Sequence, residues 1–165
     1  MGHPRDYTPL LDALKPGAND TETMQRVVDA LWDAFKERGW SWVGFYLVHP
    51  DKPEEMVLGP RRDKPACSPI GLHGCCGRSY LSRRSLVVAD VKVMGAGYIA
   101  CDPRDVSEVV VPCLNPDGTA WGVLDIDSFN RGEFDEQDAM CLARLLRHVG
   151  LSAHQSEDRG TIEVL

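Results

Sequence analysis

The chain has 165 residues, of which 43% are hydrophobic and 26% charged, and its formal net charge is −7. This length fits one domain, which buries about 70% of the surface of its unfolded chain. The negative charge disfavours broad electrostatic binding to nucleic acid, and no apolar run reaches the length of a membrane span. Residues 1–6 lack the apolar core of a secretory signal, so we expect a cytoplasmic protein.

Two long helices are expected, one toward each end of the chain. The first begins at residues 19–21, any of which can cap it, and continues with apolar residues at helical spacing to Phe35. The last begins near Asp135, with Asp138 three residues later as a variant of the capping box. A short helix is expected at 76–83, and strands are expected at 40–48, 56–58, 86–89, 108–113 and 119–127.

The order of these elements favours an α+β domain. The strands follow one another along the chain, and the turn at 115–118 joins two of them in an antiparallel hairpin. The two long helices come before the first strand and after the last one, and do not alternate with the strands. We expect one domain over 1–153, with a mostly antiparallel sheet, followed by a polar tail over 154–165 whose composition suits disorder. Residues 59–72 and 91–106 are expected to be loops, and loops of this length in a compact domain are usually functional.

Six cysteines are present, and five of them lie between residues 67 and 113. No pair has Cys-x-x-Cys spacing, and His73 with Cys75 matches no common zinc pattern, so we expect neither a metal ion nor a cofactor. One interpretation is a set of buried thiols that pack as small apolar side chains. The other is thiol chemistry at Cys101, which lies in a glycine-containing loop seven residues before Glu108.

Asp125 and Asp127 alternate with apolar residues in a predicted strand, so both carboxyl groups face one side of the sheet. A solvated sheet face is one explanation, although aspartate is depleted in strands. The alternative is a polar pocket, to which Glu108 on the neighbouring strand can add a third carboxyl group. Crowded carboxyl groups raise one another's pKa, and a protonated one can serve the oxygen of a sulfoxide that a thiolate attacks at sulfur.

Attack by Cys101 on a sulfoxide would leave a sulfenic acid, which a second thiol condenses into a disulfide. The candidates for that second thiol are Cys67, Cys75 and Cys76. Trp42 and Tyr46, four residues apart in the first predicted strand, point to the same face. They serve either the core or an apolar wall that suits a methyl thioether group.

With these residues in view, the sequence resembles the free methionine-(R)-sulfoxide reductases, which are single-domain enzymes of the GAF fold. The resemblance extends over about residues 42–146 and consists of seven segments in order. Three are Lys-Pro-Ala-Cys at 64–67, Ile-Ala-Cys-Asp at 99–102 and Leu-Asp-Ile-Asp within 122–128, and the others lie at 42–46, 58–60, 74–77 and 107–112. Each segment alone is a weak signal, and the full set is specific.

The resemblance implies a GAF sheet of about six antiparallel strands between N- and C-terminal helices, frequent homodimerisation, and thioredoxin as the reductant. It implies that free methionine sulfoxide is the substrate. It also implies that Cys101 attacks the sulfoxide sulfur, that Cys67 resolves the sulfenic acid through a Cys67–Cys101 disulfide, and that Cys76 is the third cysteine of the family.

The same resemblance implies roles for the remaining site residues. Glu108, Asp125 and Asp127 bind the sulfoxide oxygen and polar groups of the substrate, and Trp42 and Tyr46 form the aromatic wall. The pattern departs from the family in three respects. The spacings on either side of Cys76 each differ by one residue, Cys75 replaces an apolar residue, and Gly-Ala-Gly-Tyr at 95–98 replaces the usual approach to Cys101.

Two functions of other classes use the same features. One is a GAF-type sensor that binds a small ligand without turning it over, for which an aspartate pair is a poor lining if the ligand is an anionic nucleotide. The other is a thiol-based redox sensor in which the Cys67–Cys101 disulfide is the switch.

Overall fold

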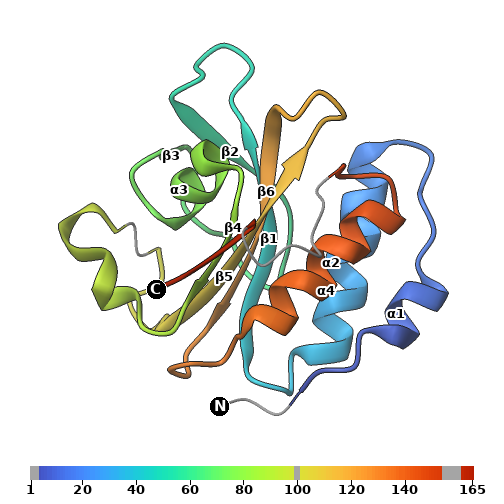
Figure 1. The fold of residues 1–165 in the computed structure, drawn as a ribbon, viewed down its shortest axis with the longest axis horizontal. Helices are drawn as coiled ribbons and strands as arrows, with labels where there is room; N and C mark the ends of the chain where they lie inside the picture. The colour runs from blue at the N-terminus through green and yellow to red at the C-terminus, as the bar shows by residue number, and fades with distance from the viewer. Residues whose placement is uncertain (1–3, 99–100, 154–160) are drawn as a thin grey trace.

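The computed structural model describes residues 4–98, 101–153 and 161–165. Its helices are α1 (Thr8–Ala13), α2 (Asp20–Phe35), α3 (Cys75–Ser82), the 3-10 helix η1 (Val91–Gly97) and α4 (Glu136–His148). Its strands are β1 (Trp40–Val48), β2 (Glu55–Arg62), β3 (Ile70–Gly71), β4 (Ser85–Val88), β5 (Ser107–Leu114), β6 (Ala120–Ser128) and β7 (Ile162–Val164). Figure 1 shows α2 and α4 beside each other on one side of the sheet, with α3 on the other side.

Over the described residues the sheet has seven strands in the order β3-β2-β1-β6-β5-β4-β7. All neighbouring strands are antiparallel except β4 and β7, which are parallel. The expected α+β architecture with a mostly antiparallel sheet is therefore confirmed. The strand count differs from the expected six because β3 is a two-residue strand and β7 comes from the segment that we had assigned to a tail.

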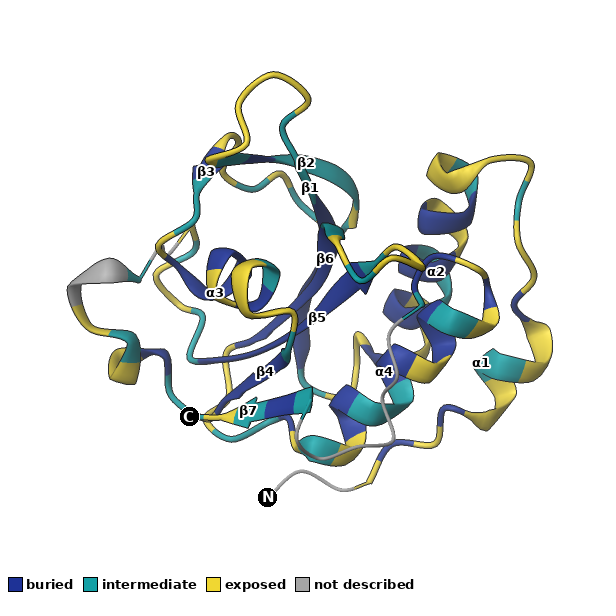
Figure 2. Ribbon diagram, turned by 45° about the horizontal axis from the view of Figure 1, so that its top comes forward, coloured by how far each residue is buried: buried dark blue, intermediate teal, exposed yellow. Residues whose placement is uncertain are grey.

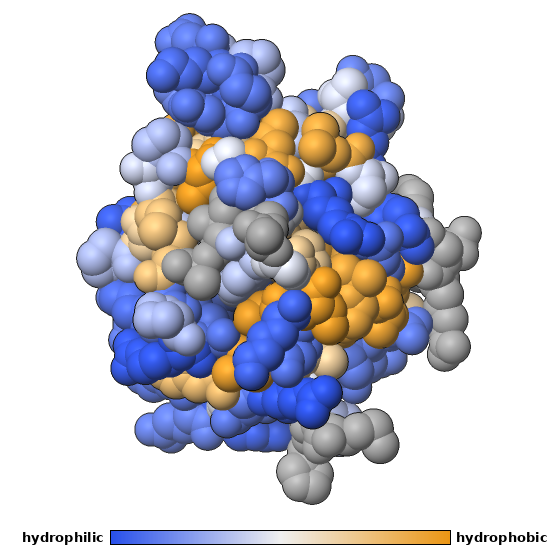
Figure 3. Space-filling view, turned by 90° about the vertical axis from the view of Figure 1, so that its left-hand side faces the viewer, coloured by the Kyte–Doolittle hydropathy of each residue, from blue (hydrophilic) through white to orange (hydrophobic). Residues whose placement is uncertain are grey.

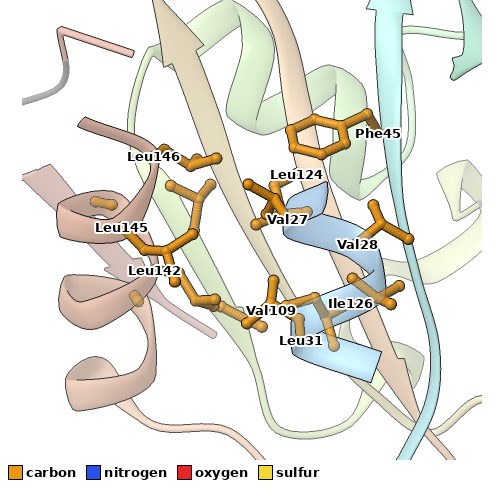
Figure 4. Packing of buried hydrophobic residues seen from close by; sticks show 14 of the residues in the cluster. Val27, Val28, Leu31, Phe45, Val109, Leu124, Ile126, Leu142, Leu145 and Leu146 are labelled. Atoms are coloured by element: carbon orange, nitrogen blue, oxygen red, sulfur yellow. The ribbon is translucent and has the colours of Figure 1, made fainter. Parts of the chain in front are cut away.

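The main hydrophobic core fills the space between the sheet and the pair α2 and α4. One face of β1, β5 and β6 supplies apolar side chains such as Phe45, Val109 and Leu124, and these pack against Leu31 of α2 and Leu142 of α4. Figure 4 shows this packing, in which residues from both helices meet residues from the three strands. The opposite face of the same strands is thereby left for α3 and the two long loops.

Capping residues define where the two long helices begin. Asn19 caps α2 by accepting a hydrogen bond of 2.9 Å from the backbone N–H of Glu22. Asp135 and Asp138 form a complete capping box at the start of α4. Helix α1 is not predicted by the sequence pattern, because it has six residues and no buried side chain and so carries no apolar stripe that periodicity could detect.

Strand β2 is longer than we expected. The sequence predicts a strand that ends at Leu58 and a loop over 59–72, because Gly59 and Pro60 follow. The structure corrects this, since β2 continues to Arg62 and pairs with β1, with a shift in register opposite Gly59 and Pro60. Proline is tolerated there because β3 pairs with β2 only at residues 55 and 56, which leaves the outer side of β2 unpaired at Pro60.

The segment predicted as a polar tail also contains regular structure. Residues 162–164 form β7, which pairs with residues 85–87 of β4, and Leu165 exchanges backbone hydrogen bonds with Val87 and Ala89. Two or three alternating residues are too short a pattern to predict a strand, so the pairing depends on the open edge of β4. Residues 154–160 of the predicted tail lie outside the described residues.

Strands β1, β4, β5 and β6 are buried over most of their length, whereas the connections around them are exposed (Figure 2). A second, smaller cluster of buried side chains lies between the sheet and α3, and it includes Trp42, Tyr46 and Cys76. None of the helices in the described part of the chain has the length and apolar character needed to cross a membrane.

Candidate active site

The register of three strands brings the predicted carboxyl groups together. Glu108 of β5 lies directly opposite Asp127 of β6, and Asp127 in turn lies opposite Trp42 of β1. Asp125 and Asp127 face α3, while Leu124 and Ile126 between and beside them belong to the main core on the other face. The alternation read from the sequence is thus confirmed.

The three carboxyl groups line a cavity of about 250 Å³ under α3. Glu108, Asp125 and Asp127 are 4%, 5% and 9% exposed, so they do not lie on a solvated sheet face. The same cavity is lined by Trp42, Tyr46, Cys76 and Cys101. Seven of the eight predicted site residues therefore share one cavity, and the eighth, Cys67, is bonded to Cys101 at its edge.

Burial and mutual repulsion raise the pKa of all three carboxyl groups above the usual values. Burial, followed by the charge of Asp127, raises the pKa of Glu108 to about 8. Burial also raises the pKa of Asp125, where Glu108 is the next cause, and that of Asp127, where Asp125 is. The cavity thus offers proton-donating carboxyl groups near neutral pH.

Asp125 holds an acceptor atom that is not used within the described residues. Its Oδ1 is buried and accepts no hydrogen bond there. A buried acceptor without a partner is costly, at about 1–3 kcal/mol, so a donor on a bound molecule would be favoured at this point. An ammonium group or a hydroxyl group supplies such a donor.

Trp42 and Tyr46 form one wall of the cavity, with ring centroids 6.0 Å apart. Gly44 between them makes this possible, because a Cβ atom at that position would meet the ring of Trp42. Both side chains also hold the loop that carries Cys67. The indole N–H of Trp42 donates to the carbonyl oxygen of Lys64 at 2.9 Å, and the hydroxyl of Tyr46 donates to that of Cys67 at 2.8 Å. The sequence predicted the wall and not these hydrogen bonds.

Cys67 and Cys101 are joined by a disulfide, with their Cα atoms 5.6 Å apart. This is the bridge that the family resemblance implied, and it connects the two long loops across 34 residues of sequence. Both cysteines are exposed, in contrast to the buried Cys75, Cys76 and Cys113. In the segment that precedes Cys101, Ile99 and Ala100 lie outside the described residues.

Cys75 and Cys76 are the first two residues of α3, and both line the cavity opposite the carboxyl groups of the sheet. Gly77 allows this close packing, because a Cβ atom there would collide with the backbone of Leu72. Burial raises the pKa of both thiols, with Glu108 the next cause for Cys75 and Asp125 for Cys76. Both cysteines are therefore thiols, and not thiolates, at neutral pH.

Three donor atoms in the cavity are close enough to hold a metal ion. The Sγ of Cys76 and carboxyl oxygens of Glu108 and Asp125 lie within 4.8 Å of one another. His73, whose pairing with Cys75 the sequence analysis disfavoured as a zinc site, is exposed and does not belong to this group. The same three donors are also placed to hydrogen-bond a small organic molecule.

A cluster of charged residues stands at the mouth of the cavity, and the sequence analysis missed it. Lys64 and Arg104 both pair with Asp102, the residue after Cys101. Hydrogen bonds from Arg104 and then from Lys64 hold the pKa of Asp102 well below its usual value. Both cations also lie over the ring of Phe129. The sequence signal that could have indicated this cluster is the pair of opposite charges at Lys64 and Asp102, each close to one of the two loop cysteines.

Few large apolar side chains are exposed in the described part of the chain. They are Leu81, Val93, Phe129 and Val164. Figure 3 views the side of the molecule on which α3 and η1 lie, and it shows apolar patches interspersed with hydrophilic side chains.

Comparison with known proteins identifies the family. The model of the GAF domain matches residues 18–152. The chain is 34% identical over 125 residues to a free methionine-R-sulfoxide reductase of Saccharomyces cerevisiae. The aligned region covers 74% of this chain and 69% of that protein.

Two solved structures agree with that assignment. A free methionine-R-sulfoxide reductase from Neisseria meningitidis in complex with its substrate is 33% identical, with a TM-score of 0.75, and the match covers 90% of this chain and 91% of that chain. The fRMsr of Staphylococcus aureus in its reduced form is 33% identical, with a TM-score of 0.78 and coverage of 90% and 96%. The chain therefore belongs to the GAF domain family and, within it, to the free methionine-R-sulfoxide reductases.

Proposed function

We propose that this chain reduces free L-methionine-(R)-sulfoxide to methionine, with Cys101 as the attacking thiol and Cys67 as the resolving thiol. The observation that carries the proposal is the Cys67–Cys101 disulfide at the edge of a cavity that buries three carboxyl groups. A thiol and a proton donor are the two groups that reduction of a sulfoxide requires.

In the first step Cys101 attacks the sulfoxide sulfur. Glu108, whose pKa of about 8 keeps it protonated at neutral pH, donates a hydrogen bond to the sulfoxide oxygen and draws electron density from sulfur. The oxygen is transferred to Cys101, which becomes a sulfenic acid, and the substrate leaves as methionine.

In the second step the thiol of Cys67 attacks the sulfenic acid. A bond forms between the two Sγ atoms, the S–O bond of Cys101 breaks, and the oxygen leaves as water with one proton from Cys67 and the hydroxyl proton of the sulfenic acid. Thioredoxin then reduces the exposed disulfide and restores both thiols. The two steps and the reduction together convert one sulfoxide and one dithiol into methionine, water and one disulfide.

Other cavity residues bind and orient the substrate. Trp42 and Tyr46 contact the methyl thioether end, because their rings form the apolar wall. Asp125 and Asp127 accept hydrogen bonds from the ammonium group, for which Oδ1 of Asp125 has a free acceptor position. Cys76, the third cysteine of the family, remains a thiol and donates a hydrogen bond to Asp125.

The proposal includes the context of the reaction. The domain comprises residues 4–153 together with β7 at residues 162–164, the protein works in the cytoplasm as a homodimer, and thioredoxin is its reductant. The exposure of both bridged cysteines supports a macromolecular reductant, because a disulfide must be accessible for exchange with another protein.

The direct test supplies each free methionine sulfoxide epimer together with thioredoxin, thioredoxin reductase and NADPH. We expect methionine from the R epimer alone. Cys101→Ser should form none, whereas Cys67→Ser should form about one equivalent and then stop, because its sulfenic acid is not resolved. Folded protein that forms no methionine from the R epimer, yet oxidises rapidly at Cys101 with peroxide, would instead favour the redox sensor. A ligand-induced thermal shift that persists in Cys101→Ser, without turnover, would favour the binding sensor.

A further inference from the structure

The two bridged cysteines lie on different loops, which among the described residues are joined by the disulfide and by one side-chain ion pair. Cys67 lies between the end of β2 at Arg62 and the start of β3 at Ile70, and Cys101 lies between η1 and β5. A disulfide needs Cα atoms within about 7 Å of each other, so the two loops must approach this closely when the bond forms.

A side-chain ion pair joins these loops directly. The Nζ of Lys64 donates to Oδ2 of Asp102 at 2.7 Å, across 38 residues of sequence. Lys64 is three residues before Cys67, and Asp102 directly follows Cys101. Each partner of the ion pair is thus attached to one of the two cysteine loops.

Arg104 and Phe129 hold this pair in one geometry. Arg104 donates from Nε to Oδ1 of Asp102 at 3.0 Å and from its terminal nitrogen to Oδ2 at 2.9 Å. The cationic groups of Lys64 and Arg104 lie 5.0 Å and 4.7 Å from the centroid of the Phe129 ring. The Asp102 side chain is 13% exposed and that of Lys64 is 34% exposed, so the pair is partly shielded from water.

We propose that Lys64 and Asp102 form a clamp that positions Cys67 over Cys101 and so accelerates disulfide formation from the sulfenic acid. The clamp rests on the roles proposed above for these two cysteines. It acts on the second step, in which the Cys67–Cys101 bond forms and water leaves, more than on the attack of Cys101 on the substrate.

The anchors of the Cys67 loop explain why the second step is the sensitive one. Trp42 and Tyr46 hold the loop to the cavity wall through the carbonyl oxygens of residues 64 and 67. These hydrogen bonds remain when the ion pair is lost, so the fold and the cavity remain. What is lost is the one side-chain ion pair that, among the described residues, ties this loop to the loop of Cys101.

The test measures the two steps separately in a single turnover without reductant. Lys64→Met removes the charge and keeps most of the length of the unbranched side chain. We expect disulfide closure to slow about fivefold, the size of effect that a partly exposed ion pair produces, while methionine formation slows less than twofold. Lys64→Arg, which keeps the positive charge, should close the disulfide at close to the natural rate. Methionine is quantified after rapid quenching, and the sulfenic acid is trapped with dimedone and counted by mass spectrometry.

A double variant and a matched control sharpen the result. Asp102→Asn should slow closure at least as much as Lys64→Met does, because it also weakens the pair with Arg104. The double variant should be no slower than Asp102→Asn alone, because the pair of Lys64 with Asp102 is already lost there. Lys36→Met removes an exposed ion pair of α2 with Asp33 and should change neither step. Salt should slow closure in the natural chain and have less effect in Lys64→Met.

Peroxide makes the test independent of the reductase activity. It oxidises the Cys101 thiol to the same sulfenic acid and is itself reduced to water, so closure is measurable even if no sulfoxide is reduced. Closure in Lys64→Met at the natural rate, or an equal slowing of methionine formation and closure, would overturn the clamp. Absence of methionine from the natural chain would overturn the proposed function and leave the clamp to the peroxide result.

Discussion

The hydroxyl group of Tyr46 donates a hydrogen bond of 2.8 Å to the carbonyl oxygen of Cys67, 21 residues further along the chain. A side chain of the cavity wall thereby holds the backbone of the loop that closes the disulfide. We expect Tyr46→Phe to lower the free energy of unfolding of the disulfide form by about 0.5–1.5 kcal/mol, because the ring stays and only the donor is lost. Urea denaturation followed by tryptophan fluorescence measures the difference.

Tyr80→Phe is the matched control for that variant. Tyr80 lies on α3, and its hydroxyl donates no hydrogen bond to the residues that the structure describes. Its replacement should leave stability within about 0.5 kcal/mol of the natural chain. Equal stabilities of the two variants would show that the hydrogen bond to Cys67 contributes nothing measurable.

Stability should fall as the pH rises from about 4.5 to about 8, because of Glu108. Its pKa is about 8 in the folded protein and 4.5 for an unperturbed side chain. Below 4.5 both states bind the proton, and between the two values only the folded state does, so unfolding becomes easier by up to about 1.4 kcal/mol per pH unit. The raised pKa values of Asp125 and Asp127 act in the same direction.

Glu108→Gln should make this dependence on pH shallower, since the amide does not titrate. Denaturation midpoints at several values between pH 5 and pH 9 measure the slope, and Glu54→Gln in an exposed turn is the control. A slope in Glu108→Gln that matches the natural chain would mean that Glu108 is ionised in the folded protein at neutral pH.

In the reduced protein, five of the six thiols should fall into two classes of reactivity toward iodoacetamide. Cys67 and Cys101 are exposed and should be modified within minutes at pH 8. Cys75, Cys76 and Cys113 are buried, and burial raises their pKa, so they should react only after denaturation. Peptide mass spectrometry gives the order of modification. Rapid labelling of Cys76 would show that α3 opens readily and that Cys76 competes with Cys67 for the sulfenic acid.

Arg5→Ala should destabilise the fold without altering the cavity. Arg5 is buried and pairs with Glu133 at 2.5 Å and with Asp138 at 3.0 Å. Removing it leaves two carboxylates without their cation, which costs about 3–5 kcal/mol in a buried site. Thermal unfolding measures the loss, and Arg26→Ala, which breaks an exposed pair with Glu22, should cost at most about 1 kcal/mol. A loss as small in Arg5→Ala would contradict a structural role for the buried cluster.

Local patterns predicted the parts of the site that lie on strands. The alternation in β6 was sufficient to place Asp125 and Asp127 on one face, and the capping residues at 19 and 135 were sufficient to place α2 and α4. The contacts between loops could not be obtained in this way. The pairing of Lys64 with Asp102 depends on how two irregular segments approach each other in space, and no period in the sequence encodes that approach.

The pairing of β7 with β4 has a practical consequence for handling the protein. Without residues 161–165 the backbone N–H and C=O groups along the outer side of β4 would be free to recruit a strand from a second molecule, which is a common start of aggregation. The backbone of Leu165 itself is hydrogen-bonded to Val87 and Ala89. An affinity tag joined after Leu165 therefore needs a flexible spacer. A truncation that removes residues 161–165 should make the protein more prone to aggregate.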